Sequence, residues 1–397
     1  MIEKTRRRRE WRGAGMTDRF LLAPDSFKGT LSAQQVCGAL RRELLQVYPE
    51  AEVVSIPMAD GGEGSVDAFL TAVGGEKVTL SCRGPHEEDL TAFYGLLPDG
   101  TAVIEMAAAA GLPLVGDRLE PDTATTYGVG QLMANAADRG AKKLILCLGG
   151  SATNDGGCGA AAALGVRFLD EAGNAFVPTG GTLDRIARID PSGRRSLPET
   201  VVMCDIDNPL CGPAGASAVF GPQKGADASM IARLDGNLSH LAEVIRRDLG
   251  ADIRDLPGAG AAGGMGGGAV AFFGGRLQMG AETVLDTVGF DALARGARLV
   301  ITGEGRLDGQ SVRGKVISAV ARRSRAAGAP CVAVVGAVGD GADGIYDLGV
   351  DGVFTTNHAP EPFEKVRGHA EENLCRTARN LFRFLAAMDL ADGKARP

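Results

Sequence analysis

Five short clusters of polar side chains, set among glycines, contain the residues best suited to chemistry. They are APDSFKGT (23–30), PMADGGEGS (57–65), GGSATNDGG (149–157), CDIDNP (204–209) and TGEGRLDGQS (302–311). Each cluster follows an apolar, strand-like run. Because open α/β sheets bind ligands at the carboxyl ends of their strands, we predict that these clusters are ligand-binding loops rather than plain turns.

Acidic residues recur at these strand ends, at Asp25, Asp60, Glu63, Asp155, Asp205, Asp207, Glu304 and Asp308. A carboxylate can take a proton from a hydroxyl group, and Mg²⁺ prefers one or two carboxylates together with phosphates and water. We predict that Asp60 or Asp205 is the general base. Asp155, Glu304 and Asp308 are the predicted metal ligands, and the last two are alternatively suited to substrate hydroxyls.

Basic residues in or near the clusters can neutralise phosphate charge. Lys28 or Lys224 is predicted to stabilise a transferring phosphoryl group, and Lys315, at the start of a predicted helix, to touch a phosphate. The planar guanidinium of Arg306 suits a substrate carboxylate. The predicted catalytic set is therefore Lys28, Asp60, Asp205, Lys224 and Arg306.

The loop at 149–157 is rich in glycine and leads into AAAALG, a predicted helix start. Backbone N–H groups and the helix dipole there favour an anion, either phosphate or carboxylate. Similar reasoning at the other strand ends completes the predicted substrate- and phosphate-binding set: Asp25, Ser26, Gly61, Gly62, Gly149, Gly150, Ser151, Thr153, Asn154, Asn208, Gln310 and Lys315.

Two glycine motifs resemble nucleotide-binding fingerprints without meeting them. GQSVRGKV (309–316) fits G-x-x-x-x-G-K, but Val316 stands where a P-loop needs Ser or Thr, which excludes a true P-loop. GAGAAG (258–263) fits G-x-G-x-x-G without a preceding strand, and it leaves a nicotinamide-dependent oxidoreductase as an alternative. The glycines here predict a mobile loop or a close backbone crossing. His358 is the one histidine placed like a site residue.

Composition narrows the class of protein. The 397-residue chain has a net charge of -7, although its first 15 residues carry six basic and two acidic side chains. An acidic body disfavours nucleic acid, but the basic arm leaves a ligand-sensing protein as a further alternative. Eight cysteines without a C-x-x-C pair, and no long apolar run, predict a cytoplasmic protein away from membranes. We expect small-molecule partners and a monomer or homodimer.

The elements that position these clusters follow from hydrophobic spacing. Strands at 19–24 and 51–58 alternate with helices at 32–47 and 64–74, which favours a parallel sheet. Three successive strands (76–84, 90–97 and 101–108) and a hairpin at 166–178 interrupt this order. The βα alternation returns in strands at 297–303, 331–338 and 351–357 and in helices at 315–328 and 363–388.

We therefore predict an α/β protein with two α/β domains and the active site in the cleft between them. A Rossmann-like doubly wound domain comprises 18–78 plus 285–390, and an inserted mixed α/β domain comprises 79–284. A disordered basic arm (1–17) and a tail (391–397) lie outside both.

The sequence resembles the type-1 glycerate kinase family. The resemblance rests on APDSFKGTLSA, PMADGGEGSVDAFL, LGGSATNDGGCGAAAALG, CDIDNPLCGPAGASAVFGPQKGA and ITGEGRLDGQSVRGKV, in order over about 19–381. It implies ATP- and Mg²⁺-dependent phosphorylation of D-glycerate in organic-acid, glyoxylate and serine-linked carbon metabolism. The family's usual product is 2-phosphoglycerate, and 3-phosphoglycerate is the open alternative. The residue roles above come from chemistry, not from the resemblance.

Overall fold

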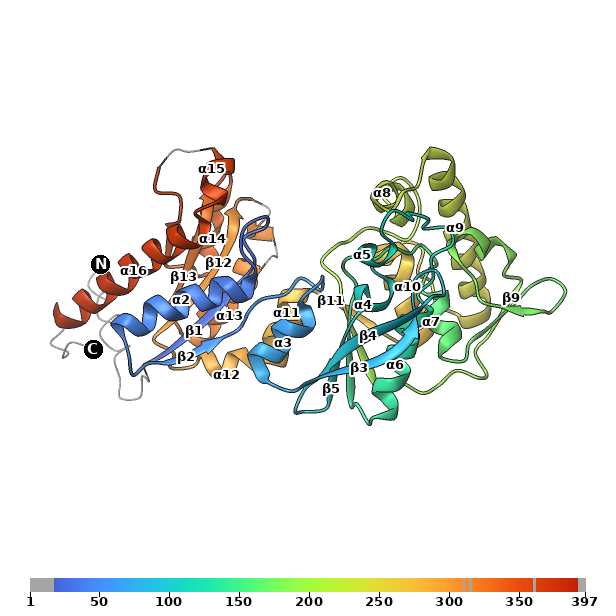
Figure 1. Ribbon diagram of the computed structural model, residues 1–397, viewed down its shortest axis with the longest axis horizontal. Helices are drawn as coiled ribbons and strands as arrows, with labels where there is room; N and C mark the ends of the chain where they lie inside the picture. The colour runs from blue at the N-terminus through green and yellow to red at the C-terminus, as the bar shows by residue number, and fades with distance from the viewer. Residues whose placement is uncertain (1–17, 310, 314–315, 360–361, 392–397) are drawn as a thin grey trace. The chain divides into compact units, whose positions relative to one another are not determined.

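The computed structural model describes residues 18–309, 311–313, 316–359 and 362–391 (Figure 1). It divides into two compact units, each with its own sheet. Unit 1 comprises Met1–Ala59 and Val284–Pro397, and unit 2 comprises Asp60–Thr283. Most of the predicted arm and tail, together with Gln310 and Lys315, lie outside the described residues.

Unit 1 contains a parallel sheet in the order β14-β13-β12-β1-β2. Its strands are β1 (Arg19–Pro24), β2 (Glu52–Ser55), β12 (Leu299–Leu307), β13 (Cys331–Val338) and β14 (Gly352–Thr355). The chain places β2 on one side of β1 and the later strands on the other. The strand order therefore reverses between β1 and β12, and such a switch point is where doubly wound sheets bind ligands.

Helices α2 (Ala33–Val47) and α16 (Ala370–Ala391) pack side by side on one face of this sheet (Figure 1). Ser32 and Gln35 form the predicted capping box at the start of α2. Phe20 and Leu22 of β1 point into the core beneath these helices, while α13 (Val316–Ala327) packs against β12 outside that core. The remaining elements of unit 1 are α11 (Gly280–Thr287, which runs across the division), α12 (Phe290–Ala294), η3 (Ser311–Arg313), η4 (Ala342–Gly344), α14 (Ile345–Leu348) and α15 (Phe363–Arg367).

The C-terminal helical segment differs from the expectation. A single helix was expected over 363–388, and the structure has two, α15 and α16. Gly368 ends α15, and its N–H donates to the Val366 carbonyl. Glycine is unfavourable inside a helix because it loses more backbone freedom there than other residues, which accounts for the break.

Unit 2 is built on a mixed sheet in the order β11-β10-β6-β5-β4-β3. Its strands are β3 (Glu76–Arg83), β4 (Asp89–Leu96), β5 (Thr101–Glu105), β6 (Lys143–Cys147), β10 (Glu199–Met203) and β11 (Arg276–Gln278). Strands β5, β6, β10 and β11 are parallel, and β3 and β4 are antiparallel, as the three successive strands predicted. A small second sheet holds β7 (Arg167–Leu169), β8 (Ala175–Phe176) and β9 (Arg188–Asp190).

The helices of unit 2 bury two apolar clusters, one around Tyr94 and Leu146 and one around Phe168 and Phe272. The rings of Phe168 and Phe272 meet edge to face with their centroids 5.7 Å apart. The helical elements are α3 (Ser65–Val73), α4 (Ala107–Ala110), α5 (Leu112–Val115), α6 (Tyr127–Asp138), α7 (Cys158–Ala163), η1 (Gly180–Arg185), α8 (Ala216–Phe220), η2 (Pro222–Lys224), α9 (Ala228–Leu249) and α10 (Ala261–Phe273).

The first division between the units lies earlier than the predicted boundary near residue 79. Helix α3 belongs to unit 2 because it packs against β4 and β5. Its Val66 N–H donates to the Glu105 carboxylate at 2.6 Å, which ties the helix to the end of β5. The return to unit 1 at Val284 lies next to the predicted residue 285.

The glycine-rich run after residue 257 is a close backbone crossing, one of the two predicted alternatives. A side chain at Gly263 would overlap the Thr153 carbonyl, and one at Gly268 would overlap the Gly156 carbonyl. The run follows a loop and enters α10, so the strand that a dinucleotide-binding fingerprint requires does not precede it. The glycines thus let two backbones pack, which removes the support for the oxidoreductase alternative.

Candidate active site

The switch point of unit 1 gathers one group of predicted site residues. Strand β12 is longer than β1, whose last paired residue is Pro24, opposite Gly303. Beyond that pair, the Asp25 N–H donates to the Gly303 carbonyl at 2.8 Å. Segment 25–28 therefore runs beside the part of β12 that extends past the end of β1.

Glycine permits this close approach. A Cβ on Gly305 would lie 3.3 Å from the Cα of Phe27, tighter than ordinary van der Waals contact. Glu304 and Arg306 lie on either side of Gly305 in β12, so their side chains share one face of the strand. The switch point thus brings Asp25, Ser26 and Lys28 next to Glu304 and Arg306.

These side chains differ in exposure. Glu304 is 6% exposed, whereas Lys28 and Arg306 lie on the surface. The Arg306 Nε is 3.7 Å from an Asp308 carboxylate oxygen, and Asp25 Oδ1 accepts a hydrogen bond from the Ser26 N–H at 2.6 Å. The edge therefore offers accessible cations beside carboxylates. The predictions for Gln310 and Lys315 fall outside the described residues.

In unit 2 three predicted segments meet at the carboxyl ends of β6 and β10. The Gly149 N–H donates to the Gly61 carbonyl at 2.7 Å, and a side chain on Gly149 would overlap the Gly62 backbone. A Cβ on Gly61 would lie 3.1 Å from the Cβ of Met203, the last residue of β10. Segment 60–63 therefore crosses the ends of both strands, and only glycines allow it to lie so close.

The two predicted general bases lie at this edge with exposed carboxylates. Asp60 Oδ1 accepts a hydrogen bond from the Gly62 N–H at 3.0 Å. Asp205 Oδ1 accepts one from the Gly280 N–H at 2.6 Å. Each carboxylate is thus oriented by a backbone donor and remains accessible. Asn208 is placed differently, because its amide donates to the Ala214 carbonyl at 2.8 Å and braces its own loop.

Asp155 is fully buried and already occupies the helix end where an anion was predicted. Its Oδ2 accepts from the Thr126 N–H and hydroxyl at 2.8 Å each and from the Gly159 N–H at 3.1 Å. Its Oδ1 accepts from the Gly157 N–H at 3.1 Å. Burial raises the pKa of the carboxyl group, and these hydrogen bonds oppose the rise. The contacts favour a structural role, and the metal-ligand role of Asp155 stays a prediction.

The accessible part of this loop is therefore small. Gly149 and Gly150 reach the surface, whereas residues 151–161 are all buried. The Asn154 amide donates to the Ser217 hydroxyl at 3.1 Å, and the Thr153 hydroxyl is buried without a hydrogen-bond partner. Any ligand that binds the loop from its surface meets the two glycines first.

Lys224 lies beneath the loop, with 2% of its surface exposed. Its ammonium group donates to the Ser151 hydroxyl at 2.8 Å and to the Thr153 carbonyl at 2.7 Å. Burial lowers the pKa of Lys224 to about 7, and the nearby Asp155 charge opposes that fall. Both donated hydrogen bonds thus go to the loop, and the predicted direct contact of Lys224 with a transferring phosphoryl group stays a prediction.

Sequence reasoning missed two polar residues that shape this edge. Glu105, at the end of β5, is 3% exposed and accepts the Val66 N–H at the start of α3, and burial raises its pKa. Thr126 donates to Asp155 and accepts from the Ala160 N–H at 2.9 Å. The sequence offered one sign of such a role, because Glu105 is the single charged residue in the otherwise largely apolar predicted strand at 101–108.

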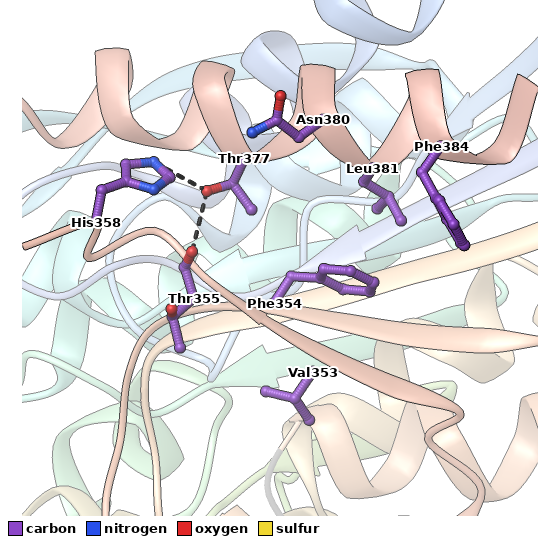
Figure 2. Close-up of a pocket in the computed structure, with 8 residues that line it drawn as sticks. All are labelled: Val353, Phe354, Thr355, His358, Thr377, Asn380, Leu381 and Phe384. Atoms are coloured by element: carbon purple, nitrogen blue, oxygen red, sulfur yellow. Dashed lines mark hydrogen bonds between the residues drawn. The ribbon is translucent and has the colours of Figure 1, made fainter. Parts of the chain in front are cut away.

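His358 lines a pocket of about 420 Å³ between β14 and α16 (Figure 2). Its Nε2 lies 3.2 Å from the Asn373 carbonyl and 3.3 Å from the Thr377 hydroxyl. Phe354 and Phe384 line the apolar part of the same pocket. These contacts give His358 a structural role in joining β14 to α16.

Within the described ranges, no three or more His, Cys, Asp or Glu side chains form a group able to hold a metal ion. Mg²⁺ in phosphoryl-transfer sites typically keeps its waters and binds one or two carboxylates plus substrate phosphates. The carboxylates of Glu304 and Asp308, both oxygen donors near the switch point, fit that kind of site.

Comparison with known proteins decides the family. The glycerate kinase family matches residues 20–386. The chain belongs to the glycerate kinase family. It is 44% identical to a glycerate kinase of Bacillus subtilis (strain 168) over 91% of this chain and 96% of that one. It is 42% identical to a glycerate 2-kinase of Escherichia coli (strain K12), covering 93% and 98% of the two chains.

A solved structure supports the same assignment. The crystal structure described as glycerate kinase 2 from Salmonella typhimurium LT2 superposes with a TM-score of 0.83 at 41% identity, covering 94% of this chain and all of that one. The predicted family and α/β fold class are thereby confirmed, and membership makes the chain an enzyme. Kinase activity implies the use of ATP. No helix among the described residues is long and apolar enough to span a membrane.

Proposed function

We propose that the chain transfers the γ-phosphoryl group of ATP to D-glycerate and forms 2-phosphoglycerate in an Mg²⁺-dependent reaction. The observation that carries the proposal is the 42% identity, over nearly the whole of both chains, to a protein named glycerate 2-kinase. Accessible acids and cations at the carboxyl edges of both sheets supply the chemical groups that phosphoryl transfer needs. The setting would be cytoplasmic organic-acid metabolism.

Asp60 or Asp205 would take the proton from the glycerate hydroxyl. Both carboxylates are exposed and each is held by a backbone N–H, so each can orient an oxygen towards a bound alcohol. Lys28 would neutralise phosphate charge, and the exposed guanidinium of Arg306 would pair with the glycerate carboxylate.

Glu304 and Asp308 would hold Mg²⁺, which when bound neutralises charge on the ATP phosphates. Glu304 lies in β12 and Asp308 directly follows that strand, near the switch point between β1 and β12. Of the two exposed glycines, Gly149 already donates its N–H to the Gly61 carbonyl, so the N–H of Gly150 would receive an anionic oxygen, from an ATP phosphate or the glycerate carboxylate. The exposure of these two glycines, in a loop that is otherwise buried to residue 161, supports this placement.

A coupled assay of ADP formation by the purified full-length chain tests the proposal. We expect ADP to form only when D-glycerate, ATP and Mg²⁺ are all present, and L-glycerate to be a poor substrate. Removal of Mg²⁺ with a chelator should stop the reaction, and added Mg²⁺ should restore it. ADP formation that does not depend on glycerate would refute the proposed substrate.

A further inference from the structure

We propose that Lys224 is a positioning residue that fixes the glycine-rich loop from beneath, so that the N–H of Gly150 stays oriented for an anionic oxygen. This inference rests on the proposed function for the identity of the anion. The bracing itself is a property of the ligand-free protein. It replaces a direct contact between Lys224 and the transferring group with an indirect action through the loop.

The contacts of Lys224 are the first support. Its two hydrogen bonds end on residues two positions apart in the loop, at the Ser151 hydroxyl and the Thr153 carbonyl. An ammonium group has three protons to donate, so the loop takes most of its capacity. With 2% of the residue exposed, the group faces the buried side of the loop and not its surface.

The short helix η2, which carries Lys224, is itself held in place. Lys224 ends the short helix η2, and Gly225 follows with a φ of +97°. A side chain on Gly225 would overlap the Leu119 backbone, so the end of η2 packs closely against the segment that contains Leu119. A hydrogen bond from so constrained a segment can hold the loop in one conformation.

The loop is held on its other side as well. Asn154 donates to Ser217 of α8, and the Asp155 carboxylate accepts the N–H groups of Gly157 and Gly159. Backbone hydrogen bonds hold the two glycines themselves, from the Gly149 N–H to the Gly61 carbonyl and from the Leu112 N–H to the Gly150 carbonyl. Lys224 adds side-chain ties directly after them, at Ser151 and Thr153. Its loss should therefore loosen residues 151–153, next to Gly150, while the Asp155 network still holds the start of α7.

Hydrogen–deuterium exchange of the ligand-free protein tests the bracing directly. Lys224→Met keeps the length of the side chain and removes its donors. We expect exchange in peptides covering 149–155 to become about tenfold faster or more, because two buried acceptors lose their partner. Ser151→Ala, which keeps Lys224, should accelerate exchange there by a smaller factor. Unchanged exchange in both variants would overturn the proposal, whether or not the chain phosphorylates glycerate.

A matched control separates this effect from a general consequence of losing a lysine. Lys142→Met makes the same change at an exposed position outside the site. It should leave both the exchange at 149–155 and the kinetics unchanged. In all variants, exchange in α16 should match the wild type, since that helix belongs to unit 1. Faster exchange in α16 as well would mean general unfolding and would count against a local brace.

Kinetics distinguish a brace from a group that touches the transferring phosphoryl. We expect Lys224→Met to raise the KM for ATP or for glycerate by about tenfold, with a smaller change in kcat. The double variant with Ser151→Ala should be no worse than Lys224→Met alone, because both changes break the same tie. A fall in kcat of roughly a hundredfold at unchanged KM, or additive losses in the double variant, would indicate direct contact with the reacting phosphate.

Discussion

Replacing Asp155 should show that this buried carboxylate holds the structure of unit 2 together. Asp155→Ala deletes the acceptor for four hydrogen bonds, three of which come from the backbone N–H groups of Thr126, Gly157 and Gly159. All three donors lie in buried segments, so water cannot replace the lost acceptor without a rearrangement. Asp155→Asn keeps the volume and one acceptor oxygen but removes the charge.

The expected size follows from these contacts. A buried donor left without a partner costs about 1–3 kcal/mol, so the three backbone donors together give about 3–9 kcal/mol. Removing a carboxylate whose pKa burial raises recovers part of this loss. We therefore expect Asp155→Ala to lower the free energy of unfolding by about 3–5 kcal/mol and Asp155→Asn by about 1–3 kcal/mol.

Urea unfolding followed by far-ultraviolet circular dichroism measures this difference. The single tryptophan of the sequence, Trp11, is not among the residues of unit 2, so unit 2 has no tryptophan of its own to serve as a probe. A chain with two units can unfold in two steps, and only the step of unit 2 should shift. Asp117→Ala, at an exposed position, is the control and should stay within about 0.5 kcal/mol of the wild type. Wild-type stability of Asp155→Ala, combined with weakened Mg²⁺ binding, would refute the structural role and favour the metal-ligand prediction.

Three further predictions concern the pH dependence of stability, the packing of α16 and the crossing at Gly149. Because the pKa of Lys224 falls from 10.5 to about 7 on folding, the unfolded chain binds more protons between these values. The free energy of unfolding of the wild type, minus that of Lys224→Met, should therefore rise by about 1.4 kcal/mol per pH unit between about pH 8 and pH 9. Urea unfolding measures this difference, and a difference that does not change with pH would contradict the effect of burial on the pKa of Lys224. Asp389→Ala should destabilise unit 1 by about 1.5–3 kcal/mol in the same assay, because it removes one of the two carboxylate partners of the mostly covered Arg298 side chain; a loss below about 1 kcal/mol would contradict this. Gly149→Ala should lower the free energy of unfolding by about 1–3 kcal/mol and raise KM, because the added methyl group would overlap the crossing segment. The control Gly236→Ala, on the open face of α9, should be neutral or slightly stabilising. Equal behaviour of the two variants would count against the crossing.

The sequence predicted the framework of both sheets well, because buried strands and amphipathic helices leave a local periodic signal. Strand β13 occupies the predicted 331–338, and α2 begins at the predicted capping box. The first unit boundary and the break between α15 and α16 were not predicted. The former depends on α3 packing against distant strands, and the latter on a single glycine, Gly368.

The chemistry of the site was predictable as a set of residues but not as a set of roles. Asp60, Asp155 and Asp205 share a residue type and a similar position after a strand. Only the fold shows that Asp155 is covered by Thr126 and the glycine loop while the other two carboxylates stay exposed. Lys224 is the same case, because segments distant in sequence determine its burial.

Phosphorus-31 nuclear magnetic resonance of the reaction product tests the central claim most directly. The purified chain would be incubated with D-glycerate, ATP and Mg²⁺ and the new phosphate ester observed without coupling enzymes. Transfer to the hydroxyl on C2 predicts a doublet, because that phosphorus couples to a single carbon-bound proton. A triplet would place the phosphate on C3 and contradict the proposed position of transfer, and the absence of any new ester signal would contradict glycerate phosphorylation altogether.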